Sequence, residues 1–210
     1  MGAYALTPLT FKTYNIMACT ALTKGRGLDC NRISGGIKNI YFGVYDQFTA
    51  PLTTVGIVQA NGEISDIEMA TSTGLYRYTT PLGVASLSET ITGSKENGTV
   101  FMTPSVTVIL NRLTKEDQNQ IKLLSQTKLV IFCELNATLA NGHNVIVGLG
   151  VTNGMELNAG TMDSGAAFGD RNGYTLTFDG MEPIPFPMVA DYTTNPFDNA
   201  AFTNVSITTS

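Results

Sequence analysis

The stretch that decides the fold runs from Val106 to Leu135 and reads VTVILNRLTKEDQNQIKLLSQTKLVIFCEL. Its two ends are β-branched and apolar, which is typical of buried strands. Between them, Thr114 stands three residues before Asp117, and a hydroxyl followed at that spacing by an acidic residue is a signature of a helix N-terminus. The stretch therefore predicts one helix, at about 114–126, flanked by two core strands.

The rest of the chain has strand and turn patterns but no second helix pattern. Residues 37–44, 64–69 and 75–79 are expected strands, and 174–178 alternates between apolar and polar residues. The dipeptide Asn141-Gly142 lies between two apolar runs and predicts a hairpin turn with positive φ at both central positions. The residues thus indicate a mainly β protein with one helix.

A further hairpin is predicted at about 86–103, with a polar tip at 94–98. At this length the chain is expected to form one core domain, from 35 to 187. An N-terminal arm, 1–34, is expected before this domain and a lightly structured C-terminal tail, 188–210, after it.

Composition limits the kinds of partner that the chain can have. The 210 residues carry a formal charge of −5, with a pI of about 4.8, and only 14% of them are charged. An acidic protein does not hold nucleic acid by neutralising phosphates, although nucleic acid can pass along a surface that repels it. Hydroxyl and amide side chains cost less to desolvate than charged ones, so a chain with few charged residues is suited to contacts between subunits. Residues 1–10 lack a signal-peptide pattern and no apolar run reaches membrane-spanning length, so neither export nor a membrane partner is expected.

The chain lacks the patterns of the common catalytic and metal sites. No nucleophile elbow, zinc-spaced cluster or phosphate-binding loop occurs, so we expect no enzyme, no metal and no cofactor. His143 is the only histidine and adjoins a predicted turn. We expect its side chain to be exposed and its replacement by Ala to leave stability nearly unchanged. Cys133 is expected to be a buried thiol, and whether Cys19 and Cys30 form a disulfide stays open.

Over about 35–187 the chain resembles the tail tube (major tail) proteins of tailed bacteriophages. The resemblance is carried by architectural features rather than by a catalytic signature. These features are Gly35-Gly36-Ile37 before a strand with Ile40-Tyr41, the strand–helix–strand stretch 106–135, Gly148-Leu149-Gly150 with Gly154-Met155-Glu156, and the run 165–180 followed by Met181-Glu182-Pro183.

The resemblance implies a fold of two packed antiparallel sheets, which form a barrel-like sandwich with one flanking helix. It also implies a structural virion protein, made in the host bacterial cytoplasm, whose copies form stacked rings. The rings are expected to be hexameric and to contact other phage tail proteins. Their inner sheets would join into a channel through which genomic DNA passes without specific binding.

Two sets of residues are candidates for these roles. The lumen is expected to be acidic or neutral, since each Lys or Arg facing the channel would hold a phosphate. The candidate lumen residues are Asp66, Glu68, Ser88 and Thr90. Segments with apolar residues but little regular period are expected to mediate self-assembly, so that deletion of 89–100 leaves a folded protein that does not polymerise. The candidate subunit-interface residues are Phe48, Leu52, Glu89, Ile91 and Val100.

Two other classes of protein fit the same residues. One is a different virion component, such as a head-decoration, baseplate or ring protein. The other is a β-sandwich adhesin or carbohydrate-binding module, in which Tyr76 and Tyr78 would form a binding platform because they share one face of a strand. Packing against a neighbouring strand explains the two tyrosines as well.

Overall fold

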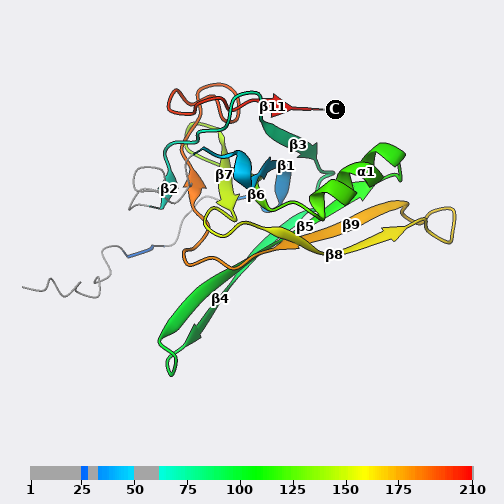
Figure 1. The fold of residues 1–210 in the computed structure, drawn as a ribbon, viewed down its shortest axis with the longest axis horizontal. Coiled ribbons are helices and arrows are strands. Elements are labelled where there is room, and N and C mark those ends of the chain that lie inside the picture. Colours follow the sequence, from blue (N-terminus) through cyan, green and yellow to red (C-terminus); the bar gives the residue numbers. More distant parts are fainter. Residues whose placement is uncertain (1–24, 28–32, 50–61, 210) are drawn as a thin grey trace, which may run out of the picture. The chain divides into compact units, whose positions relative to one another are not determined.

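The structure is a computed structural model that describes residues 25–27, 33–49 and 62–209 (Figure 1). The described residues form a seven-stranded sheet, a four-stranded sheet and one α-helix. The predicted class, mainly β with two sheets and one helix, is confirmed. The two sheets form a sandwich but do not close into a barrel.

The strand order of the larger sheet is β11-β3-β1-β6-β7-β10-β2. Its strands are β1 (Ile37–Val44), β2 (Glu63–Ile64), β3 (Leu75–Thr79), β6 (Leu129–Thr138), β7 (Asn144–Leu149), β10 (Met188–Val189) and β11 (Ile207–Thr208). The order of the smaller sheet is β4-β5-β9-β8. Its strands are β4 (Ser86–Ser94), β5 (Thr99–Asn111), β8 (Glu156–Asp163) and β9 (Gly173–Asp179). The helices are α1 (Lys115–Leu124) and the single 3-10 turn η1 (Tyr45–Gln47).

The expectation of two antiparallel sheets is wrong in part, because the larger sheet also contains parallel pairs. β2 pairs with β10, and β3 with β11, in parallel. Both pairs involve the C-terminal part of the chain. It returns to the sheet after long connections, and parallel strands need such connections because a tight turn cannot join them.

The main core lies between the two sheets. On β6, Leu129, Ile131 and Cys133 point into this core, whereas Val130 and Phe132 belong to a second cluster on the opposite face of the sheet. β6 is therefore buried on both faces, which explains its uninterrupted apolar sequence.

The second core covers the outer face of the seven-stranded sheet. Ile64, Ile67 and Met69 contribute to it from one segment, and Phe197 contributes from another. The Phe197 ring lies 5.0 Å from Tyr41 and 5.2 Å from Phe132, between ring centroids. The segment expected to be a lightly structured tail thus adds two short strands and a core aromatic to the domain.

The predicted helix is present and begins as expected. Thr114 is the N-cap, and its Oγ1 accepts a hydrogen bond from the Asp117 backbone N at 3.0 Å. The same hydroxyl donates to Asp117 Oδ2 at 2.6 Å. Ile121 and Leu124 are half-buried against the main core, whereas Leu123 is mostly exposed. The helix therefore rests on the sandwich by a narrow apolar stripe.

The β6–β7 hairpin pairs as predicted, but its turn differs. Gly142 has φ +88°, and Asn141 is not among the residues with positive φ. Leu139 N donates to His143 O at 2.8 Å, and Gly142 N donates to Leu139 O at 3.0 Å. The loop thus has three residues with glycine in the left-handed position, the alternative to the two-residue turn that had been expected.

β5 is longer than the sequence indicated, because it continues through Pro104. Met102 N donates to Glu182 O on the side of β5 away from β4, and residues two apart on a strand have their N–H groups on the same side. The proline ring therefore lies on that side, just beyond Ser105 and Asp179, the last continuous pair of β5 and β9. Gly180 N still donates to Pro104 O at 3.3 Å, so the proline costs only the one hydrogen bond that an N–H at this position would have made toward Gly180, and the β4–β5 ladder is not affected.

Candidate functional site

The outer face of the four-stranded sheet is built of small polar side chains. Along β5 the inward residues are buried and the outward ones are hydroxyl-bearing over most of the strand. β9 repeats this alternation, with Thr175, Thr177 and Asp179 outward. We call this outer surface the polar face. Its outward residues are Ser86, Ser88, Thr90, Thr92 and Ser94 on β4, Thr99, Phe101, Thr103, Ser105, Thr107, Ile109 and Asn111 on β5, Gly173, Thr175, Thr177 and Asp179 on β9, and Glu156, Asn158, Ala159, Thr161 and Asp163 on β8. Phe101 and Ile109 are the large apolar side chains among them.

Strand register aligns these residues in rows across the sheet. One row runs from Ser88 through Ser105 and Asp179 to Glu156. In a neighbouring row, Thr107 Oγ1 lies 3.4 Å from Thr177 Oγ1. Cross-strand hydroxyl pairs of this kind stabilise a sheet on a face that is not covered by a core.

The charge of the polar face is mainly negative. Asp163, Asp179 and Glu156 lie on it, and Asn158 Nδ2 donates to Asp179 Oδ2 at 2.9 Å. Arg171 is the cation that reaches it, since its Nη2 donates to Thr175 Oγ1 at 2.6 Å.

Four further lysines and arginines, whose presence in the lumen would contradict the expected acidic or neutral channel, lie elsewhere. Lys38 pairs with the buried Glu134 at 3.0 Å on the seven-stranded sheet. Lys128 lies over the Tyr45 ring, 4.6 Å from its centroid. Arg77 is on β3, also in the larger sheet, and Lys95 is at the tip of the β4–β5 hairpin. None of these four is among the outward residues of the polar face.

The four candidate lumen residues separate into two groups. Ser88 and Thr90 are exposed on the polar face. Asp66 and Glu68 are not on it, and they do not share one face of a strand, because β2 ends at Ile64. Burial of Ile64, Ile67 and Met69 beneath the larger sheet forces the segment out of regular alternation. The alternating Thr/Ser pattern of β5 and β9 was the sequence signal that could have revealed the rest of the face.

The β4–β5 hairpin projects beyond the body of the sandwich (Figure 1). The inward face of its base is covered, since Met102 is buried. Ile91, which pairs with Met102 across the hairpin, and Val100, further out, lie on the same face but have 66% and 61% of their surfaces exposed. The hairpin therefore carries apolar side chains past the edge of its own core, and Ile91 and Val100 stay candidate interface residues.

The other candidate interface residues lie differently. Glu89 has a partner in its own chain, because its Oε1 accepts a hydrogen bond from Phe186 N at 3.0 Å. Burial raises the pKa of the Glu89 carboxyl. Phe48 packs against the second core. Leu52 lies outside the described residues.

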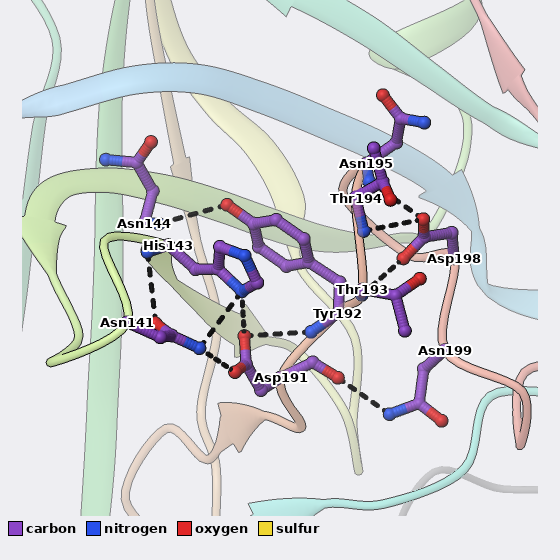
Figure 2. Close-up of polar contacts among 10 residues, drawn as sticks. All are labelled: Asn141, His143, Asn144, Asp191, Tyr192, Thr193, Thr194, Asn195, Asp198 and Asn199. Carbon is purple, nitrogen blue, oxygen red and sulfur yellow. Dashed lines mark hydrogen bonds and ion pairs between the residues drawn. The ribbon is translucent and has the colours of Figure 1, made fainter.

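His143 belongs to a contact between the β6–β7 turn and the C-terminal segment (Figure 2). Its Nδ1 lies 2.7 Å from Asp191 Oδ1, and its ring stacks on Tyr192 with centroids 4.5 Å apart. Asn141 Nδ2 also donates to Asp191 Oδ2. His143 is therefore half-buried and engaged, which corrects the expectation of a free, exposed turn residue. We call this set the C-terminal latch: Asn141, His143, Asp191 and Tyr192.

Asp198 caps the loop that follows the latch. Its carboxylate accepts hydrogen bonds from the backbone N atoms of Thr193, Thr194 and Asn195, at 2.7 to 2.9 Å. These bonds, that of Asn195 first, lower the pKa of Asp198 to about 2. The hydrogen bond from His143 is the main cause that lowers the pKa of Asp191.

Other sites named from the sequence can be placed briefly. Cys133 is a buried free thiol, as predicted, and burial raises its pKa; Cys19 and Cys30 lie outside the described residues. Tyr78 packs edge-on against Phe42, with centroids 5.0 Å apart, whereas Tyr76 is 45% exposed. Among the described residues there is no group of three His, Cys, Asp or Glu placed to hold a metal. No helix in the described part of the chain is long and apolar enough to span a membrane.

Comparisons of the chain with protein-family models, with curated proteins and with solved structures find no match.

Proposed function

We propose that the chain is a structural subunit of a phage tail tube. In this proposal copies close into a ring, rings stack, and the polar face lines the channel for DNA. The observation that carries the proposal is the four-stranded sheet, which combines a hydroxyl-lined outer face with two long open edges. The resemblance to tail tube proteins over 35–187 points the same way.

The open edges support ring formation. β4, with nine residues, and β8, with eight, are the outermost strands of this sheet, and no described strand pairs with their outer sides. Such edges readily accept a further strand. All neighbours in this sheet are antiparallel. Because the number of strands is even, β8 of one copy can meet β4 of the next in antiparallel order, and the alternation continues around a ring.

The dimensions of such a ring suit a nucleic-acid channel. Six copies would contribute about 24 strands; with strands about 4.8 Å apart and tilted by about 40°, the backbone barrel would be about 48 Å wide. Small Ser and Thr side chains would keep this opening wide. The carboxylates of Glu156, Asp163 and Asp179 would repel phosphates, so that DNA could slide without being held.

Electron microscopy of the purified full chain in negative stain tests this function. We expect rings with rotational symmetry, or hollow fibres. A monodisperse monomer at high protein concentration would overturn the proposal and favour a carbohydrate-binding or adhesin module. Rings that never stack would instead favour another ring-forming virion component.

A double variant tests the role of the hairpin more sharply than deletion of 89–100, because that deletion also removes the contact between Glu89 and Phe186. Ile91→Ser with Val100→Ser should abolish assembly, since burial of such side chains stabilises an interface by about 1.5–3 kcal/mol each. Leu82→Ser is the matched control, since Leu82 is 86% exposed in a turn away from the hairpin. Normal tubes from the double variant would show that the hairpin is not part of the subunit interface.

A further inference from the structure

The loop between β8 and β9 presents a single large aromatic side chain to solvent. Phe168 lies in this loop and is fully exposed, the most exposed of the large apolar residues described. The residues next to it are Gly165, Ala166, Ala167 and Gly169, none of which is charged.

The loop around Phe168 has a defined conformation. Asp170 Oδ2 accepts hydrogen bonds from the backbone N atoms of Ala166 and Ala167, at 3.0 and 2.6 Å. Asp170 N donates back to Ala167 O at 3.0 Å. At Gly165, φ is +72° and an added Cβ would lie 2.7 Å from Asp170 Cβ. The aromatic ring is thus presented on a preformed turn, so that little conformational entropy is lost when it binds.

An apolar cavity lies toward the opposite end of the same sheet. It occupies about 420 Å³ between the base of the β4–β5 hairpin, the start of β1 and the final residues of β6. Glu89 is the one charged residue in its lining, and its carboxylate already accepts the hydrogen bond from Phe186 N. The apolar lining comprises Ile37, Leu87, Ile91, Leu135, Ala137 and Phe186.

The loop and the cavity lie at different positions along the strand direction of the four-stranded sheet. The β8–β9 loop follows Asp163 and precedes Gly173, which pairs with Asn111 at one end of the sheet. The cavity lies beside Leu87 and Glu89, close to the row of Ser105 and Asp179. These rows are six residues apart on β5, or about 20 Å at about 3.3 Å per residue. Figure 1 shows the β8–β9 loop and the β4–β5 hairpin at opposite ends of the sheet.

We propose that Phe168 of one copy inserts into this cavity of a second copy displaced along the strand direction. Each copy then inserts its own Phe168 into one neighbour and accepts the Phe168 of another. Such a head-to-tail contact can repeat indefinitely without closing. This inference rests on the proposed function, and it assigns the contact that stacks one ring upon the next. The ring itself would close through the outer backbone edges of β4 and β8, whereas the cavity uses inward side chains of β4, among them Leu87 and Ile91.

A contact of this kind is weak for one pair of copies and strong for a ring. One buried Phe contributes about 150–250 Å² of contact area, well below what a stable dimer needs. A ring forms several such contacts at once, so that their combined affinity rises by orders of magnitude. Closed rings should therefore stack, whereas isolated subunits should not.

Phe168→Ala tests the inference in the full chain. We expect rings in wild-type numbers but tubes at least about tenfold shorter, because each ring junction loses all of its anchors at once. Phe168→Leu should keep part of the tube length, and Met181→Ala, at a residue 64% exposed outside the loop and the cavity, should keep all of it. Tubes of normal length from Phe168→Ala would overturn the inference and leave the proposed function intact. Loss of rings as well as tubes would also overturn it, by placing Phe168 in ring closure.

Disulfide cross-linking gives a second, independent measurement. Protein with Ala167→Cys, which keeps the Phe168 anchor, is mixed with protein with Ala137→Cys, both in a Cys19→Ser, Cys30→Ser background. A covalent heterodimer after oxidation of the assembled mixture is expected, while Ala167→Cys mixed with Thr107→Cys, on the polar face, should give none. Equal cross-linking in both mixtures would contradict insertion into the cavity. Absence of any ring or tube from the wild-type chain would instead be a failure of the proposed function.

Discussion

Asp198 organises the C-terminal segment through three backbone hydrogen bonds, and this predicts a dependence of stability on pH. Its folded pKa, about 2, lies below the value near 3.9 of an unfolded Asp. A group with a depressed folded pKa contributes stability above its unfolded pKa, and the contribution is lost as pH falls through the folded value. Asp191 has its pKa shifted in the same direction.

We therefore expect thermal stability to fall between about pH 4 and about pH 2. Asp198→Asn should lower the melting temperature at about pH 5, and its effect should shrink steadily toward about pH 2, where wild-type Asp198 in the folded protein is about half protonated. Thermal unfolding followed by circular dichroism measures both. A difference between variant and wild type that is constant across this range would show that the carboxylate charge is not the source of the stability.

His143 illustrates what its position in the sequence could not show. The residue adjoins a turn, but its hydrogen bond and ring stack come from Asp191 and Tyr192, 48 and 49 positions later in the chain. We now expect His143→Ala to lower the melting temperature measurably, in contrast to the earlier expectation. Asn97→Ala, in the β4–β5 turn, is the control and should have no effect. Equal melting temperatures for the two variants would show that His143 contributes nothing measurable to stability, as the sequence alone indicates.

The helix is the element that local sequence predicted best, and its cap can be tested alone. Thr114→Ala should reduce the free energy of unfolding by about 1 kcal/mol, the usual cost of losing an N-cap side chain. Thr114→Ser keeps the oxygen and should recover most of the loss. Urea denaturation of the three proteins decides this. A stability of Thr114→Ala equal to wild type would mean that the helix contributes little to the cooperative unit.

Strand elements were predictable where alternation or apolar runs are strong, as in β1, β6 and β9. The sequence divides β5 at Pro104 because a proline normally ends a central strand; in the structure the missing N–H faces away from β4, just past the end of β9, so that only one hydrogen bond is lost. The 64–69 segment was expected to be a strand, but its side chains are placed by a core formed with residues far along the chain. Sequence periodicity carries no information about such partners.

The candidate site was predictable to the same limited extent. Ser88 and Thr90 were found because β4 alternates, whereas Asp179 and Glu156 join them only through register with β5, β9 and β8. Phe168 could not be recognised, because an aromatic residue in a loop is as often a core residue as an exposed one. Its exposure is a property of the whole fold.

At the scale of the whole molecule, the polar face predicts that assembled protein does not retain DNA. Ser88→Lys with Thr90→Lys should give measurable binding of duplex DNA, weakening steeply with added salt as counterion release requires. Gln118→Lys with Asn119→Lys adds the same charge to exposed positions on α1 and is the control. Fluorescence anisotropy of labelled DNA with assembled protein measures both. Equal binding by the two double variants would show that the position of the charge, and hence the polar face, is irrelevant.

The seven-stranded sheet ends on both sides in strands of only two residues, β2 and β11. An exposed ladder of peptide groups captures any extended chain that meets it, and a strand this short offers almost none. Each sheet edge that a protein leaves open is a site at which chains can aggregate at random. In the proposed assembly, two short edges on one sheet and two long edges on the other would confine strand addition to the four-stranded sheet, so that ordered polymerisation would be favoured over aggregation.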